Sequence, residues 1–172
     1  MGYCTDSGGD AVKCNDIKIF SSKSTWATKL SQIGKIKGVV TITTYSLPDI
    51  SYARRILNKK SKNVYLIAHL KFHKKAMELK EEYPNLRIAL NNEIHAKTIT
   101  IEPITTYFTS ANFGKSTWYE SSIGLHSKEV HDITQQRFKY LWHASDEIND
   151  SFDINKILKK NHEKNKSKWK WR

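Results

Sequence analysis

Alternation between strand-like and helix-like segments constrains the fold of this chain more than any other feature of its sequence. Five segments are rich in the β-branched and aromatic residues that strands favour: 39–45, 63–68, 86–90, 94–101 and 104–109. Helical segments separate the first three; one begins at Pro48, and the other runs from Leu70 until Pro84 ends it. Strands that alternate with helices and then form a hairpin predict an α/β fold, in which helices flank a mixed β-sheet.

The flanking segments extend this pattern. A short strand is expected at 17–20, and Ser24 can cap a helix that Gly34 would end. Another strand is expected at 122–126, followed by a helix at 128–148 whose apolar side chains recur at helical spacing. We expect this apolar face to pack in the core or against a second copy of the chain.

The length of 172 residues suits one domain with a substantial core. Near the N-terminus, paired glycines and a lack of periodic hydrophobicity indicate a loose arm. Near the C-terminus, lysines dominate. The chain is therefore expected to divide into a flexible arm at 1–15, a folded domain at 16–150 and a basic tail at 151–172.

Side chains of the kind that contact phosphate gather late in this pattern. His95 and Lys97 lie two positions apart in an expected strand, so both should point to one face, about 6 to 7 Å apart along the backbone. Ser110 and Asn112 follow in the turn after the next strand, where a hydroxyl and an amide can meet the same phosphate. Glu102 has the opposite parity, so it joins them only if the strand ends or bulges there.

Together these residues resemble the HKD motif of the phospholipase D superfamily, H-x-K-x4-(D/E) followed by a (G/T)-S-x-N turn. The resemblance covers roughly residues 17–145. It implies a phospholipase D-like sandwich with one HKD motif per chain, and it makes 16–150 the catalytic domain. The catalytic residues that it implies are His95, Lys97, Asn112, Ser110, Glu120 and Glu102.

The family builds its active site from two HKD motifs, and no second motif occurs in this sequence. The resemblance therefore implies an obligate homodimer whose two-fold axis passes through the site. His95 of one chain would attack phosphorus to form a phosphohistidine, while His95 of the other protonates the leaving oxygen. Lys97, Asn112 and Ser110 would bind phosphate oxygens, and Glu120 and Glu102 would orient the imidazole. This scheme requires neither a metal nor another cofactor.

Charge indicates the class of substrate. The chain has 29 Lys and Arg against 17 Asp and Glu, a net charge of +12, which favours polyanions and above all nucleic acid. We expect DNA rather than RNA. Basic and aromatic residues suited to backbone contact and base stacking are Lys115, Lys166, Lys168, Trp169, Lys170 and Trp171. A disordered, solubilising tail is an equally good interpretation of the C-terminal cluster.

The sequence predicts a cytoplasmic protein with no membrane association. Its N-terminal segment lacks the apolar core of a secretory signal, and no apolar run approaches the roughly 20 residues of a membrane span. Cys4 and Cys14 are expected to be ordinary thiols, and only an oxidising compartment would let them form a disulfide.

Three functions follow from these observations. The first is a metal-independent phosphodiesterase, an endonuclease that cleaves nucleic acid. The second is a nucleic-acid-binding protein of the same fold with weak or no activity, because Glu102 and Thr109 stand where the family usually has aspartate and glycine. The third, a phospholipase, ranks last because the sequence has no export signal, no membrane-binding surface and a single motif.

Overall fold

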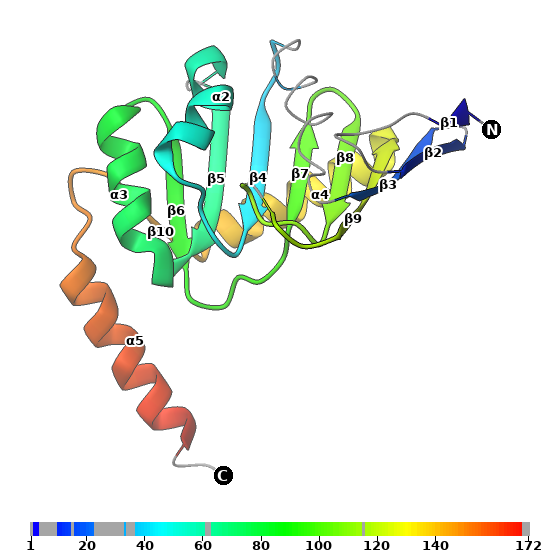
Figure 1. The fold of residues 1–172 in the computed structure, drawn as a ribbon. Coiled ribbons are helices and arrows are strands. Elements are labelled where there is room, and N and C mark those ends of the chain that lie inside the picture. The colour runs from blue at the N-terminus through cyan, green and yellow to red at the C-terminus, as the bar shows by residue number, and fades with distance from the viewer. Residues whose placement is uncertain are drawn as a thin grey trace.

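The computed structural model describes residues 2–3, 10–14, 16–22, 33, 37–60, 63–114 and 116–169. Within these ranges, ten strands form one sheet in the order β1-β2-β3-β9-β8-β7-β4-β5-β6-β10 (Figure 1). The strands are β1 (Gly2–Tyr3), β2 (Asp10–Cys14), β3 (Ile17–Ser22), β4 (Val40–Thr44), β5 (Val64–His69), β6 (Arg87–Asn91), β7 (Thr98–Ile101), β8 (Thr105–Thr109), β9 (Glu120–His126) and β10 (Asp146–Glu147).

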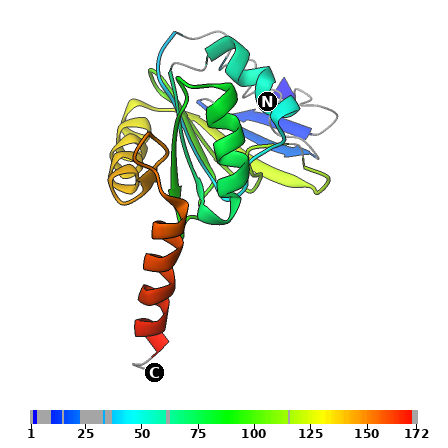
Figure 2. The same ribbon diagram turned by 90° about the vertical axis from the view of Figure 1, so that its left-hand side faces the viewer.

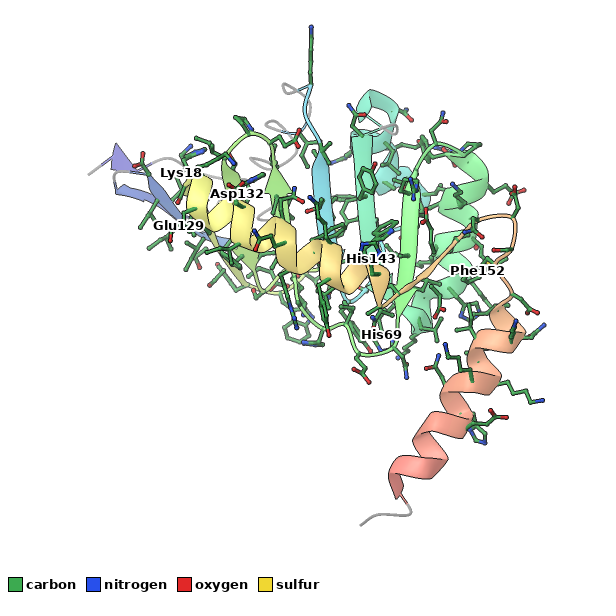
Figure 3. The ribbon with its side chains drawn as sticks, turned by 180° about the vertical axis from the view of Figure 1, so that it is seen from behind. Lys18, His69, Glu129, Asp132, His143 and Phe152 are labelled. Carbon is green, nitrogen blue, oxygen red and sulfur yellow. The ribbon has the colours of Figure 1, made fainter. Side chains whose placement is uncertain are left out.

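Helices cover both faces of this sheet. Helices α2 (Ile50–Lys60) and α3 (His73–Glu82), the latter preceded by the short 3-10 helix η2 (Leu70–Phe72), pack on one face. Helix α4 (Lys128–His143) crosses the other face, as Figures 2 and 3 show. Helix α5 (Ile154–Trp169) projects away from the sheet. None of the described helices combines the length and apolar character needed to cross a membrane.

The sheet is mixed, and its centre is buried. Strands β4, β5 and β6 run parallel, whereas β7 pairs antiparallel with β4 and continues into β8, β9 and β3. The larger apolar core, which includes Ile42, Leu66 and Tyr107, packs with α2 and α3, and a smaller one around Ile67 and Phe138 lies under α4. The predicted α/β fold with a mixed sheet flanked by helices is confirmed.

Close packing at Gly124 aligns the strands that lead to the site. Gly124 pairs with Tyr107 across β8 and β9, and a Cβ at Gly124 would fall 2.5 Å from the Tyr107 ring. A larger residue there would displace a fully buried tyrosine. Glycine at this position therefore lets β8 and β9 pair in this register. The pairing places the last residue of β8 near the first residues of β9.

Several elements differ from the expected ones. Residues 94–97 are not in a strand, since β7 begins at Thr98. Residues 10–14 pair with β3 instead of forming a loose arm. Much of the expected basic tail is the helix α5. The expected helix at 24–34 lies outside the described residues except for Ile33, which is helical and buried.

Helix α4 ends earlier than its apolar pattern predicts. The Ser145 hydroxyl donates to the carbonyl of Leu141 at 2.6 Å, and the chain then pairs with β6 as β10. Ile148, which continues the apolar pattern, donates its backbone N–H to Ile88 at 2.8 Å and is buried. Ile148 therefore reaches the core from an extended segment and not from the helix that its spacing predicts. The free edge of β6 provides hydrogen-bonding partners for that segment.

Candidate active site

The candidate site lies where the carboxyl ends of β4 and β5 meet the segment that enters β7. This segment follows β6 and runs along the lower edge of the sheet in Figure 1. The exposed His95 ring lies 5.2 Å from the Tyr45 ring, and Tyr45 in turn lies 4.9 Å from the His69 ring, measured between centroids. Tyr45 therefore contacts two imidazoles, one from β5 and one from the segment before β7.

His69 belongs to the site although the HKD pattern does not contain it. Its Nδ1 accepts from the backbone N–H of Lys71 at 3.0 Å, which caps η2. Burial lowers the pKa of His69, the charges of Lys71 and His95 lower it further, and a hydrogen bond with the Asn92 backbone opposes them. A largely neutral ring thus anchors the start of the segment that carries His95. Its position at the carboxyl end of a buried strand is the sequence signal that indicates such a role; Figure 3 labels it.

Lys97 faces the site from the same segment. Its Nζ donates to the carbonyl of His95 at 3.0 Å, and its own carbonyl accepts from Thr109 N at 3.1 Å. Burial lowers the pKa of Lys97, and the nearby Glu120 carboxylate partly offsets this effect. The structure thus brings together His95, Lys97 and Glu120, and it does so without a strand at 94–97.

The Glu120 carboxylate accepts two hydroxyl donors. Ser110 Oγ donates to Oε2 at 2.5 Å, and Ser116 Oγ donates to Oε1 at 2.8 Å. The backbone of Ser121 holds Ser110 in turn, since Ser121 N donates to Ser110 Oγ at 3.0 Å and Ser110 N to Ser121 O at 2.9 Å. The Ser110 hydroxyl therefore binds the carboxylate, and it would have to turn to donate to a phosphate.

The turn after β8 positions Asn112. Its Oδ1 accepts from Ser46 N at 3.3 Å, and the next residue, Phe113, donates its N–H to the buried Thr44 hydroxyl at 2.9 Å. Thr109, in the place of the usual glycine, is the last residue of β8, and its hydroxyl accepts from Ala111 N at 3.0 Å. Threonine therefore fits this turn and contributes a hydrogen bond to it.

Glu102 lies away from the cluster, so its expected role beside His95 is not supported. Its Oε2 accepts from Val39 N at 2.6 Å, at the amino end of β4. The cluster lies at the opposite end of β7, and the strand alone separates the two ends by about 10 Å. Glu102 instead lines a groove of about 670 Å³ under α4, together with Lys128 and His131. Glu102 thus anchors a strand at the end of β7 that lies away from His95.

The remaining predicted nucleic-acid contacts stay predictions. Lys115, Lys170 and Trp171 lie outside the described residues, and for Lys166, Lys168 and Trp169 only the backbone is described, as part of α5. Within the described part of the chain, no three His, Cys, Asp or Glu side chains cluster closely enough to hold a metal ion.

The cluster combines the groups that phosphoryl transfer needs. The His95 imidazole is exposed and contacts the Tyr45 ring. The Lys97 ammonium group binds the His95 carbonyl, the Asn112 amide accepts from Ser46 N, and two hydroxyls hold the Glu120 carboxylate. An imidazole can attack phosphorus or transfer a proton, and a positioned cation and amide can stabilise charge on phosphate oxygens.

The fold that carries this cluster is that of phospholipase D family proteins. The chain is similar to Nuc, a phospholipase D family member from Salmonella typhimurium, with a TM-score of 0.66 and 12% identity over 78% of this chain and 98% of Nuc. It is also similar to NucT from Helicobacter pylori, with a TM-score of 0.63 and 18% identity over 77% of this chain and 99% of NucT. The predicted resemblance to the phospholipase D superfamily is confirmed at the level of the fold.

A third similar structure is TrmBL2, an archaeal chromatin protein described with a novel mode of DNA binding. Its TM-score is 0.56, with 9% identity over 76% of this chain and 54% of TrmBL2. No protein-family model and no curated protein matches the sequence.

Proposed function

We propose that this protein is a phosphodiesterase of the phospholipase D type that cleaves nucleic acid without a metal. The observation that carries the proposal is the convergence of His95, Lys97, Asn112 and Glu120 at one end of the sheet. These residues come from three segments, before β7, after β8 and at the start of β9. Their assembly on a phospholipase D fold supports a phosphoryl-transfer site better than a structural role.

In the proposed reaction, His95 attacks phosphorus through an imidazole nitrogen. A phosphorus–nitrogen bond forms while the phosphorus–oxygen bond to the leaving group breaks, and His95 of a second chain gives its proton to the leaving oxygen. Water then attacks the phosphohistidine and gives its proton to the second imidazole. The phosphorus–nitrogen bond breaks as the new phosphorus–oxygen bond forms, which frees His95 and the phosphate product. The two chains together supply both histidines around a two-fold axis, since each chain contains one motif.

The neighbouring groups would bind and orient the phosphate. The ammonium group of Lys97 and the amide of Asn112 stabilise negative charge on the nonbridging oxygens as the pentacoordinate state forms. Glu120 attracts Lys97 and holds Ser110, so it positions the cation and the hydroxyl at once. This gives Glu120 a positioning role rather than contact with the reacting atoms.

Nucleic acid is the proposed substrate because of the net charge of +12. DNA is favoured over RNA by the likeness to TrmBL2. That likeness also supports a second candidate function, DNA binding without turnover. The hydrogen bond of Ser110 to Glu120, which occupies a hydroxyl that could otherwise donate to phosphate, is compatible with that candidate.

We expect the purified protein to cleave labelled nucleic acid in the presence of EDTA. The reason is that the proposed steps use only imidazole, ammonium and amide groups. Single- and double-stranded DNA and RNA are incubated separately with the protein, and the products are resolved by denaturing electrophoresis. Tight, salt-sensitive binding without any product would favour the DNA-binding candidate instead.

Mixing of wild-type and His95→Ala chains tests whether two chains share one site. After subunit exchange at equal concentrations, about one quarter of the dimers contain two His95 imidazoles, so activity per wild-type chain should fall to about half. Initial rates are measured before and after exchange, with a His143→Ala chain as the matched control for mixing. Unchanged activity per wild-type chain after complete exchange would show that a single chain is sufficient.

A further inference from the structure

A smaller hollow adjoins the candidate active site. It has a volume of about 360 Å³ and shares Ser46, Asn112 and Glu120 with the cluster described above. Trp118 forms part of its wall, and this side chain is 78% exposed. Because Asn112 is proposed to bind the phosphate, a group in this hollow would lie within one nucleotide of the bond that is cleaved.

The loop that carries Trp118 is attached to Glu120. Trp118 N donates to Ser116 Oγ at 3.1 Å, and Ser116 Oγ donates to Glu120 Oε1 at 2.8 Å. Glu120 is also bound to Ser110. These hydrogen bonds fix the backbone at Trp118, and its side chain lies exposed next to the site although burial of that side chain would be favourable. An exposed indole on a backbone fixed in this way is suited to stacking on a flat ligand.

The charges around the hollow indicate which part of a nucleotide it would accept. Among the described lining residues, Lys75 is paired with Asp49 at 2.6 Å, and Glu120 adds a second negative charge. The balance of these described charges is negative, which disfavours a second phosphate beside them. Tyr52 contributes an aromatic wall, with its ring in edge contact with Phe113 at 6.5 Å. A neutral, planar group with polar edges fits these walls better than an anion.

We propose that this hollow binds an unpaired nucleobase, stacked on Trp118, next to the phosphate that is cleaved. This proposal rests on the proposed function and specifies its substrate as single-stranded nucleic acid. A base within a duplex is stacked on both sides and paired, so its entry would require extrusion from the helix at a free-energy cost. Single-stranded segments present their bases without that cost.

The test measures binding separately from cleavage. In a His95→Ala background, affinity for a fluorescent single-stranded oligonucleotide is compared with and without Trp118→Ala. Loss of one stacked base should weaken binding by about 5- to 150-fold. Trp118→Phe should recover part of the loss, and the salt dependence should not change, because no phosphate contact is removed. Tyr140→Ala, which removes an aromatic side chain that is 63% exposed on α4, is the matched control.

Several outcomes would overturn the subsite. One is that the Trp118→Ala protein binds the single-stranded oligonucleotide as tightly as the protein that keeps Trp118. Another is that the substitution weakens binding of duplex DNA as much as binding of single strands. A third is that it alters the monomer–dimer equilibrium and leaves binding unchanged. The last would identify Trp118 as an interface residue. If the wild-type protein binds single strands through Trp118 but never cleaves them, the proposed function fails while the subsite stands.

Discussion

Replacement of His95 by alanine is expected to lower the hydrolysis of nucleic acid in EDTA by at least about 10⁴-fold. In a homodimer the substitution removes both imidazoles, and so it removes the nucleophile and the proton donor together; general acid–base catalysis alone contributes typically about 10² to 10⁴. Because His95 is exposed and its ring contact is with Tyr45, the fold should remain intact. Initial rates on the best substrate, with melting temperatures measured in parallel, provide the test.

A covalent intermediate gives an independent measurement of the same role. Rapid quenching of the wild-type protein with labelled substrate should trap a phosphorylated chain, and peptide mapping should locate the label at His95. His143→Ala is the matched control, since His143 is an exposed histidine at the end of α4 and is not among the residues proposed to act on the substrate. Substantial turnover by the His95→Ala protein, or a label on a different residue, would contradict the mechanism.

Replacement of Lys97 by methionine is expected to reduce kcat by about 10²- to 10³-fold, the loss typical when one stabilising group is removed from a transition state. Methionine keeps much of the side-chain length but has no charge. Steady-state kinetics should show a smaller change in KM, because the cation acts mainly on charge that develops during the reaction. An equal fall in affinity with kcat unchanged would make Lys97 a binding residue only.

The same residue predicts the alkaline limit of activity. Burial lowers the pKa of Lys97 below its ordinary value. In the proposed mechanism the ammonium form of Lys97 is the active one. Activity should therefore decline, as pH rises, at a lower pH than the ordinary lysine pKa of about 10.4 would give. Lys97→Arg, whose guanidinium stays protonated, should move this limit upward. A pH–rate profile with the same alkaline limit in both proteins would assign the limit to another group.

The pKa shift also separates loss of activity from loss of the fold. Burial lowers the pKa of Lys97 in the folded state, so the protonated side chain makes folding less favourable. This cost is fully present at pH values below the folded-state pKa, and it disappears as the pH rises from the folded-state pKa to the unfolded-state pKa. Removal of the charge in Lys97→Met is therefore not expected to lower the melting temperature at neutral pH. A clear loss of stability would mean that the hydrogen bond to the His95 carbonyl matters more than desolvation of the ammonium group.

Local sequence patterns predicted much of the sheet and the cluster. Pro48 and Pro84 mark helix boundaries, and the β-branched runs became β4 and β5. His95 and Lys97 are two residues apart, and Ser110 and Asn112 share one turn, so short stretches of chain suffice to bring each pair together. The same local patterns gave one wrong boundary. They predicted a strand from residue 94, whereas residues 94–97 precede β7, which begins at Thr98.

By itself, the sequence determined the order of the strands and helices from β4 to α4, the surplus of positive charge and the presence of a single stretch that resembles an HKD motif, because each depends on neighbouring residues or on composition. Only the tertiary structure decided that Glu102 anchors β4 and that Tyr45 and His69 join His95. It also decided that the Trp118 loop is attached to Glu120 through Ser116. These contacts depend on which strand ends lie next to each other. Pairing between segments that are distant in the sequence sets that arrangement, and residue spacing along the chain does not reveal it.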